Sequence, residues 1–214
     1  MRISHKHKFV CISITKTGST SVRYSLDEYS EIESQGDFKK PYFHHVEAER
    51  LQTHFEKKNW NWDDYFKFTF VRNPYSRLVS WWNYVKTEYH SHQNYGKSSS
   101  TEFWKNLCNE IVTKNKDFKS FVCAKNSSWF PQTSSEFIFD KDENNLLDFI
   151  GRFENLQEDF NTICDKIGIP RKQLPHKNKV KHKHYTEYYD DETRQIVAEK
   201  YAKDIDHFGY KFGE

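Results

Sequence analysis

Two apolar runs, each followed by a polar turn and then by a helical pattern, constrain the fold of this chain more than any other feature of its sequence. Residues 9–14 (Phe-Val-Cys-Ile-Ser-Ile) form the first run, whose continuous apolar character is typical of a strand buried on both faces of a parallel sheet. Residues 15–21 are small and polar and include one glycine, as expected of a tight turn. Val22, Leu26 and Tyr29 then recur at helical spacing, so the unit is strand, turn and helix.

The same unit returns at residues 66–71 (Phe-Lys-Phe-Thr-Phe-Val), which predict a second strand. Arg72 and Asn73 end this strand, and Pro74 suits the first turn of a helix that continues through Val85. Because strands alternate with helices, we predict an α/β fold whose central, mainly parallel sheet is flanked by helices.

Further elements fill the rest of the chain, whose 214 residues suit one ordinary domain. Short apolar runs predict two more strands, at residues 137–139 and 147–150. Apolar residues at helical spacing predict helices at residues 46–57, 103–112, 118–124, 156–167 and about 190–205. No internal repeat and no linker divides the sequence, so we predict a single domain over residues 1–214.

The composition indicates a folded chain whose charges are balanced. Aromatic residues make up 17% of the chain, which argues against disorder, and the formal net charge of +2 favours neither nucleic acid nor an anionic membrane surface as a general partner. No apolar run approaches the ~20 residues of a membrane span, so none is expected. The four cysteines (Cys11, Cys108, Cys123 and Cys164) are far apart and show no CxxC pairing. They favour reduced, buried thiols and a cytoplasmic location.

The first polar turn has the residue types of an anion site. Between a strand and a helix, its backbone N–H groups should point outward at the positive end of the helix dipole. The side chains that could add to such a site are a lysine and four hydroxyls around one glycine: Lys16, Thr17, Gly18, Ser19, Thr20 and Ser21. An ordinary helix cap is the alternative interpretation, but one serine or threonine would be enough for a cap. The turn is not a Walker A loop, because its lysine precedes the glycine.

A second candidate anion site follows the second strand. Arg72 stands at the strand's end and Ser80 lies on the following helix, so the two side chains can converge on one phosphate. Taken alone, the pair is better explained as a surface arginine and an unrelated helix serine. Arg72 and Ser80 therefore indicate a phosphate site only in combination with the first polar turn, which precedes them in the sequence.

Together, residues 16–21 and 72–80 resemble the sulfotransferases that use 3′-phosphoadenosine 5′-phosphosulfate (PAPS), especially the carbohydrate sulfotransferase-like branch. The resemblance extends to residues 151–156 (Gly-Arg-Phe-Glu-Asn-Leu) and 188–192 (Tyr-Tyr-Asp-Asp-Glu), and so covers nearly the whole chain in order. It implies a P-loop-like sulfotransferase fold in which the first turn binds the 5′-phosphosulfate. Arg72 and Ser80 would bind the 3′-phosphate, and adenosine 3′,5′-bisphosphate (PAP) would be the product.

The resemblance also implies roles in sulfuryl transfer. Lys16 would stabilise the negative charge that grows on the leaving nucleotide, and a histidine would take the proton of the acceptor hydroxyl. His45 fits the family pattern best through its spacing to Ala48, with His44 and Glu47 as the alternatives. An ordinary histidine pKa near ~6.5 would leave this base neutral at pH 7. We expect no metal, because no cluster of His, Asp or Glu has convincing ligand spacing.

Other interpretations remain open at this stage. The basic run of residues 177–183 suggests a heparin- or nucleic-acid-binding module, although a solvated charge run is its usual explanation and we expect no nucleic acid partner. A nucleotide kinase on a similar sheet is a third possibility. Arg152, Lys179 and Lys181 are further candidates for nucleotide contacts. The acceptor is a hydroxyl-bearing molecule, and the sequence leaves carbohydrate, phenol, lipid and peptide open.

Overall fold

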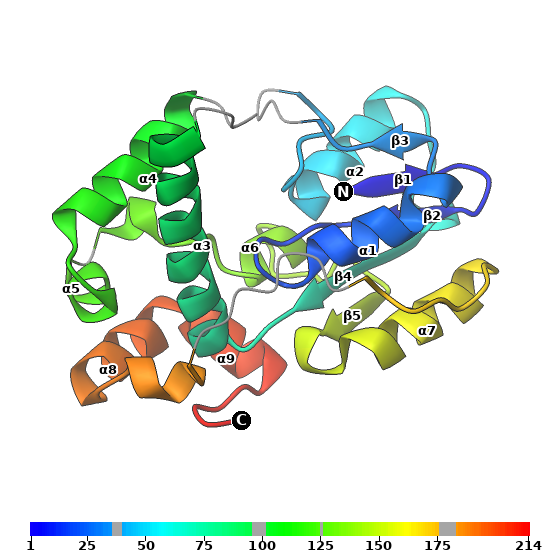
Figure 1. The fold of residues 1–214 in the computed structure, drawn as a ribbon. Coiled ribbons are helices and arrows are strands. Elements are labelled where there is room, and N and C mark those ends of the chain that lie inside the picture. Colours follow the sequence, from blue (N-terminus) through cyan, green and yellow to red (C-terminus); the bar gives the residue numbers. More distant parts are fainter. Residues whose placement is uncertain (36–39, 96–101, 125, 176–182) are drawn as a thin grey trace. The chain divides into compact units, whose positions relative to one another are not determined.

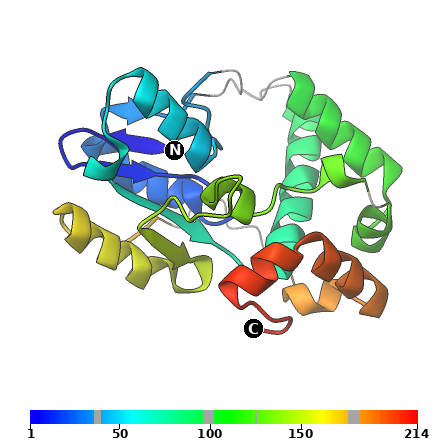
Figure 2. The same ribbon diagram turned by 180° about the vertical axis from the view of Figure 1, so that it is seen from behind.

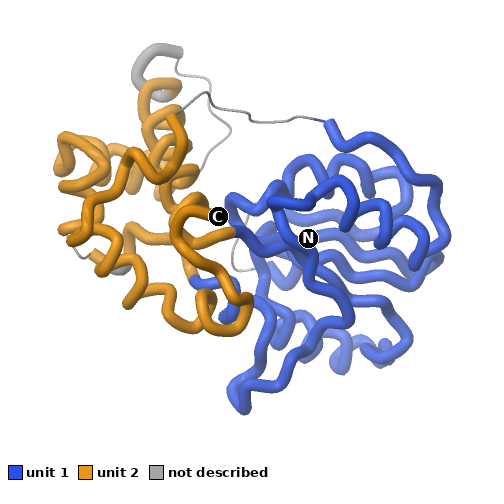
Figure 3. Tube along the Cα trace, turned by 90° about the horizontal axis from the view of Figure 1, so that it is seen from below, with its two compact units in different colours: residues 1–72, 133–178 blue, residues 73–132, 179–214 orange. Residues whose placement is uncertain are grey.

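The chain forms two compact units, which are described separately (Figure 3). The computed structural model describes residues 1–35, 40–95, 102–124, 126–175 and 183–214. Unit 1 comprises Met1–Arg72 and Thr133–Asn178, and unit 2 comprises Asn73–Gln132 and Lys179–Glu214. The single sulfotransferase domain over residues 1–214 stays a prediction.

Unit 1 is built on one mixed sheet (Figure 1). Its described residues contribute five strands in the order β3-β1-β2-β4-β5. These are β1 (Arg2–Ser4), β2 (Phe9–Cys11), β3 (Ile32–Glu33), β4 (Phe66–Val71) and β5 (Phe149–Arg152). Strand β4 pairs in parallel with both β2 and β5, whereas β1 pairs antiparallel with β2 and with β3. All strands except β1 therefore run in one direction, and the predicted α/β fold with a mainly parallel sheet is confirmed.

Helices cover the two faces of this sheet (Figures 1 and 2). On one face, Val22 and Leu26 of α1 join Phe160 and Ile163 of α7 in a core shared with Phe68. Figure 2 shows the opposite face, which α2 covers. The helical segments of unit 1 are α1 (Ser19–Leu26), η1 (Asp27–Tyr29), α2 (Ala48–Lys57), η2 (Trp62–Asp64), α6 (Ser135–Ile138), η4 (Phe153–Asn155) and α7 (Leu156–Ile167).

The predicted strands compare unevenly with those in the structure. Residues 66–71 are a strand as predicted, and the run at 9–14 is regular over Phe9–Cys11, after which the Ile12 N–H still donates to the Phe68 carbonyl at 2.9 Å. The strand predicted at 147–150 lies two residues later, at β5.

The strand predicted at residues 137–139 is wrong, because Phe137 and Ile138 belong to the short helix α6 and only Phe139 is extended, in an isolated bridge to Asn145. Thr133 and Glu136 start the helix reciprocally: the Thr133 N–H donates to the Glu136 carboxylate at 3.0 Å, and the Glu136 N–H donates to the Thr133 hydroxyl at 3.3 Å. Phe137 and Ile138 are both buried, which is why they look like a buried strand in the sequence. A threonine three residues before a glutamate is the sequence signal for the start of such a helix.

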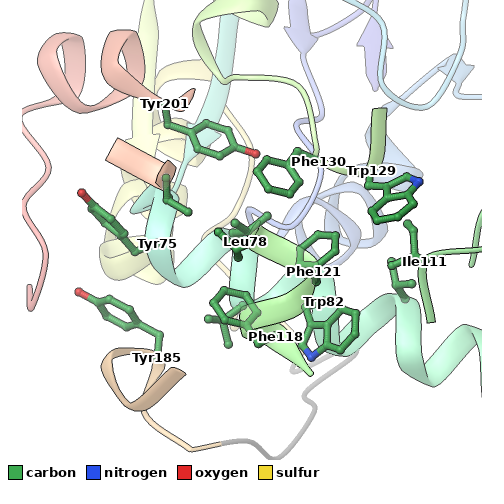
Figure 4. Packing of buried hydrophobic residues seen from close by; sticks show 14 of the residues in the cluster. Tyr75, Leu78, Trp82, Ile111, Phe118, Phe121, Trp129, Phe130, Tyr185 and Tyr201 are labelled. Atoms are coloured by element: carbon green, nitrogen blue, oxygen red, sulfur yellow. The ribbon is translucent and has the colours of Figure 1, made fainter. Parts of the chain in front are cut away.

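All the regular secondary structure among the described residues of unit 2 is helical. Its core packs Leu78 and Trp82 of α3 against Ile111 of α4 and Phe121 of α5 (Figure 4). Trp82 stacks on Phe121 with ring centroids 5.1 Å apart. The segments are α3 (Pro74–Tyr95), α4 (Glu102–Lys114), α5 (Phe118–Cys123), η3 (Ser127–Trp129), η5 (Tyr185–Tyr188), α8 (Asp191–Lys200) and α9 (Ala202–Phe208).

The last predicted helix is broken in two. Tyr201 leaves the helical conformation between α8 and α9 and lies fully buried, and its hydroxyl donates to the Pro131 carbonyl at 2.8 Å. This burial stabilises a corner where the apolar spacing predicts a straight helix. None of the described helices is long and apolar enough to cross a membrane.

Candidate active site

The turn between β2 and α1 has an unusual backbone. Both Lys16 (φ +65°) and Gly18 (φ +80°) adopt left-handed conformations. Such a conformation is uncommon for a residue other than glycine, although Lys8, Asn59 and Glu143 also adopt it here, and it persists only where the surrounding structure maintains it. Gly18 is required for a second reason, since a Cβ there would lie 2.8 Å from a methyl carbon of Leu156. The loop is therefore fixed in shape by its own backbone and by α7.

The loop directs polar groups to the start of α1. Because α1 begins at Ser19, the N–H groups of Ser19 and Thr20 have no acceptor within the helix, whereas the Ser21 N–H donates to the Gly18 carbonyl at 3.0 Å. Thr17 is buried, and its hydroxyl donates to the Ile14 carbonyl at 3.0 Å. Thr17 thus shapes the loop with its side chain, and only its backbone N–H is left for an anion.

Arg72 lies beside this loop. It follows β4 directly, and its Nη1 donates to the Lys16 carbonyl at 3.2 Å. The guanidinium also stacks on the ring of Phe153, with Cζ 4.0 Å from the ring centroid. Because β2, β4 and β5 are parallel neighbours, their carboxyl ends bring Lys16, Arg72 and Phe153 to one edge of the sheet. Sequence reasoning missed Phe153, whose signal is its place directly after the third parallel strand.

The other nucleotide candidates are less closely defined. Ser80 lies half-buried on α3, in unit 2, so its joint contact with Arg72 on one phosphate stays a prediction. The backbone N–H of Arg152 donates to the Asp159 carboxylate at 2.6 Å. Lys179 and Lys181, like most of the basic run at residues 177–183, lie outside the described residues.

His45 is tied to the backbone that leads into the loop. Its Nδ1 lies 2.8 Å from the carbonyl oxygen of Ser13, the third residue before Lys16. Burial lowers the pKa of His45 to about 3; the Ser13 carbonyl opposes this shift, and the positive charge of Arg23 adds to it. The ordinary pKa near 6.5 expected from the sequence is therefore wrong, and His45 is neutral throughout the physiological range.

His44 and Glu47 have different surroundings. The Nδ1 of His44 lies 2.6 Å from the Ser34 hydroxyl and 3.4 Å from Nη1 of Arg23. Burial, with Arg23 second, lowers the pKa of His44 to about 4. Glu47 directly precedes α2, and its side chain does not cap that helix. Sequence reasoning missed Arg23, although its position four residues after Ser19 places it on the same face of α1.

The described side chains include no group of three or more His, Cys, Asp or Glu residues that could hold a metal ion. Whether the reaction needs a metal is a separate question, and the expected metal independence stays a prediction.

Comparison with known proteins bears on the identity of this site. Residues 1–211 match the model of the Sulfotransferase family. Human carbohydrate sulfotransferase 9 is 30% identical over 151 residues, which are 66% of this chain and 33% of the relative. Mouse carbohydrate sulfotransferase 11 is 29% identical over 120 residues, which are 49% of this chain and 33% of the relative. An uncharacterized protein of Archaeoglobus fulgidus is 32% identical over 114 residues, covering 50% of this chain and 72% of that protein.

The likeness to solved structures is distant. Mouse sulfotransferase SULT7A1 complexed with PAP gives a TM-score of 0.45 at 13% identity, covering 95% of this chain and 85% of that chain. A sulfotransferase from Alicyclobacillus acidocaldarius gives 0.36 at 11% identity, covering 96% of both chains. The chain spans about a third of the length of the two carbohydrate sulfotransferases that it matches. Because the family model matches nearly the whole sequence, the chain belongs to the sulfotransferase family.

Proposed function

We propose that this protein transfers a sulfuryl group from PAPS to an acceptor hydroxyl and releases PAP. The observation that carries the proposal is the hydrogen bond from the Arg72 guanidinium to the carbonyl of Lys16. This contact places a second cation against a loop that already holds a lysine and the start of a helix. Membership of the sulfotransferase family supports PAPS over other anionic nucleotides.

The loop suits the 5′-phosphosulfate of the donor. The N–H groups of Ser19 and Thr20 stand at the positive end of α1, where oxyanions bind favourably. Arg72 would read the 3′-phosphate, with Ser80 as its partner on α3. Its planar guanidinium matches phosphate oxygens, and Phe153 holds its plane from one side.

Lys16 would act on the bond that breaks. A bond forms between the acceptor oxygen and sulfur, while the bond between sulfur and the bridging phosphate oxygen breaks and leaves its electron pair on the nucleotide. Positive charge placed where this negative charge develops lowers the barrier more than it tightens ground-state binding.

His45 would accept the proton of the acceptor hydroxyl. The Ser13 carbonyl can only accept a hydrogen bond, so it holds the His45 proton on Nδ1 and leaves a lone pair on Nε2. A base with a pKa of about 3 is weaker than the optimum near the working pH. Negative charge from a bound nucleotide would oppose the effect of Arg23 and raise the pKa of His45 during turnover.

A carbohydrate hydroxyl is the acceptor class to test first, because the two relatives with a named activity are carbohydrate sulfotransferases. The protein would be assayed with labelled PAPS and a panel of sugars, with a phenol, a lipid and a peptide alongside. Labelled sugar product is the expected result. Labelling of the phenol, lipid or peptide alone would refute the acceptor class, and no label in any acceptor would refute the transfer.

The role of Lys16 has its own test in the same assay. Lys16→Ala should lower kcat by about 10²-fold or more while PAP affinity changes only a few-fold, since backbone donors and Arg72 still hold the product. Lys57→Ala, an exposed lysine on α2, is the matched control and should change neither quantity. If Lys16→Ala keeps near-normal turnover, the loop binds an anion but does not catalyse transfer.

A further inference from the structure

The two adjacent histidines of unit 1 have opposite hydrogen-bond surroundings. The Nδ1 of His45 faces the Ser13 carbonyl, which can only accept, so this nitrogen carries the proton. The Nδ1 of His44 faces Nη1 of Arg23, which can only donate, so this nitrogen carries the lone pair. Two neutral imidazoles next to each other in sequence are thus held as opposite tautomers.

A second line of contacts reaches the same nitrogen of His44. Nη1 of Arg2 donates to the Ser34 hydroxyl oxygen at 3.0 Å. The Ser34 hydrogen is therefore directed elsewhere, and His44 Nδ1, at 2.6 Å, is its acceptor. Arg2 is itself fixed by the Asp27 carboxylate, 2.6 Å from its Nε. Two donors, the Ser34 hydroxyl directly after β3 and the Arg23 guanidinium on α1, consequently converge on one lone pair of His44.

The charges around the pair favour neutral rings. A proton added to His44 Nδ1 would face the Arg23 guanidinium, with Arg2 behind Ser34, and the pKa of His44 falls to about 4, by burial first and Arg23 second. Within the described part of the chain, neither Nε2 has a hydrogen-bond partner. Each ring therefore has one nitrogen engaged by the protein and one left for a bound molecule: a bare lone pair on His45 and an N–H on His44.

We propose that His44 is a hydrogen-bond donor to the acceptor molecule, with its proton held at Nε2, and that Arg23 and Ser34 are the positioning residues that keep it there. This inference rests on the proposed function. His45 takes the proton of the reacting hydroxyl, while His44 donates to a neighbouring oxygen of the same acceptor. The ring centroids are 6.4 Å apart, a separation that two hydroxyls of one small polyhydroxylated molecule can span.

The arrangement also separates the two candidate bases. His44 is a poor base, because two donors already occupy its lone pair and its other nitrogen carries the proton. A carbohydrate acceptor suits the pair well, since vicinal hydroxyls present one group that must lose a proton and one that can accept a hydrogen bond.

The tautomers can be measured directly. Two-bond ¹H–¹⁵N correlation spectra of the imidazoles distinguish Nδ1–H from Nε2–H, and His44→Gln and His45→Gln spectra assign the signals. At pH 7 we expect Nε2–H for His44 and Nδ1–H for His45. Arg23→Met combined with Ser34→Ala should give His44 a mixture of tautomers. Nδ1–H on His44 of the wild-type protein would overturn the proposal.

Substitution by glutamine tests the roles in the PAPS transfer assay. A glutamine amide can donate from nearly the position of Nε2 but cannot take a proton. His44→Gln should therefore keep turnover within about tenfold, whereas His44→Leu should lose about 10²-fold, as for removal of one active-site donor. His45→Gln should lose roughly 10²–10⁴-fold, as for a general base.

PAP affinity by calorimetry is the control for folding, and it should be unchanged in all three variants. If His44→Gln loses as much turnover as His44→Leu while His45→Gln stays active, the roles are reversed and the proposal is refuted. Absence of transfer by the wild-type protein would refute the proposed function and the substrate role of His44, while the spectra would still decide the tautomers.

Discussion

Acidification should destabilise this protein through His44 and His45. Burial is the main cause that lowers the pKa of His45 to about 3 and that of His44 to about 4. In the unfolded chain both return to about 6.5. Below pH 6.5 the unfolded state therefore binds more protons than the folded state does. The free energy of unfolding is retained above pH 6.5 and falls as the pH falls towards 4.

The size of the effect at pH 5 follows from the interval between that pH and the unfolded-state pKa of about 6.5. Between pH 7.5 and pH 5 the unfolded form of each histidine gains nearly a full proton over about 1.5 pH units, which costs about 2 kcal/mol per histidine. Because His44 is only half-buried, solvent screening reduces its share, and the two together should lower the free energy of unfolding by about 2–4 kcal/mol, a large part of the stability of an ordinary domain.

Urea denaturation at pH 7.5 and pH 5 measures this loss. The control is the double variant His44→Gln and His45→Gln, which removes both titrations and keeps the other histidines. Subtracting the pH dependence of the variant from that of the wild-type protein isolates the pair. If the two proteins lose the same stability on acidification, to within about 1 kcal/mol, the pair is not held neutral and the tautomer argument loses its basis.

Three further predictions concern the loop and the reaction. Gly18→Ala should destabilise the protein by about 1–3 kcal/mol and weaken PAP binding, because the added Cβ brings both left-handed backbone strain and a clash with Leu156. Gly168→Ala is the control for strain alone, since Gly168 has φ +69° and nothing lies within 4 Å of a Cβ there. Equal losses of stability in the two variants, measured by thermal melting, would argue against the clash. The pH profile of kcat/KM should show no fall near pH 6.5, since His45 in the free protein titrates at about 3, and a clear drop there would identify a different base. Transfer should proceed at an unchanged rate in EDTA, and a loss restored only by added divalent metal would contradict the metal-free mechanism.

The parts of the fold predicted from sequence are those with a strong local signal. Strand β4 is a continuous apolar run, and α7 combines a regular apolar stripe with a terminal glycine. Strands β1 and β3 were missed because they have three and two residues and carry polar side chains such as Arg2 and Glu33. The pairing of β3 with β1, which sets Glu33 opposite Arg2, exists only through contacts distant in sequence.

The candidate site divides in the same way. Lys16 and Arg72 could be predicted because each follows a strand whose direction the α/β pattern determines. The stacking of Arg72 on Phe153 depends on a third strand far along the chain, and the surroundings of His44 depend on Arg23, 21 residues earlier. Composition and spacing carry no information on such side-chain contacts, so the tautomers and lowered pKa values of the two histidines needed the structure.

Isothermal titration calorimetry with PAP and with adenosine 5′-monophosphate tests the central claim most directly. The two ligands differ only in the 3′-phosphate that Arg72 should read. PAP should bind much more tightly, and Arg72→Ala should remove most of that preference, because a charge-assisted hydrogen bond contributes about 1.5–3 kcal/mol, or roughly 10- to 150-fold in affinity. ATP and heparin should bind weakly to the wild-type protein. Equal affinity for PAP and adenosine 5′-monophosphate, or tighter binding of ATP or heparin than of PAP, would contradict a PAPS site at this edge of the sheet.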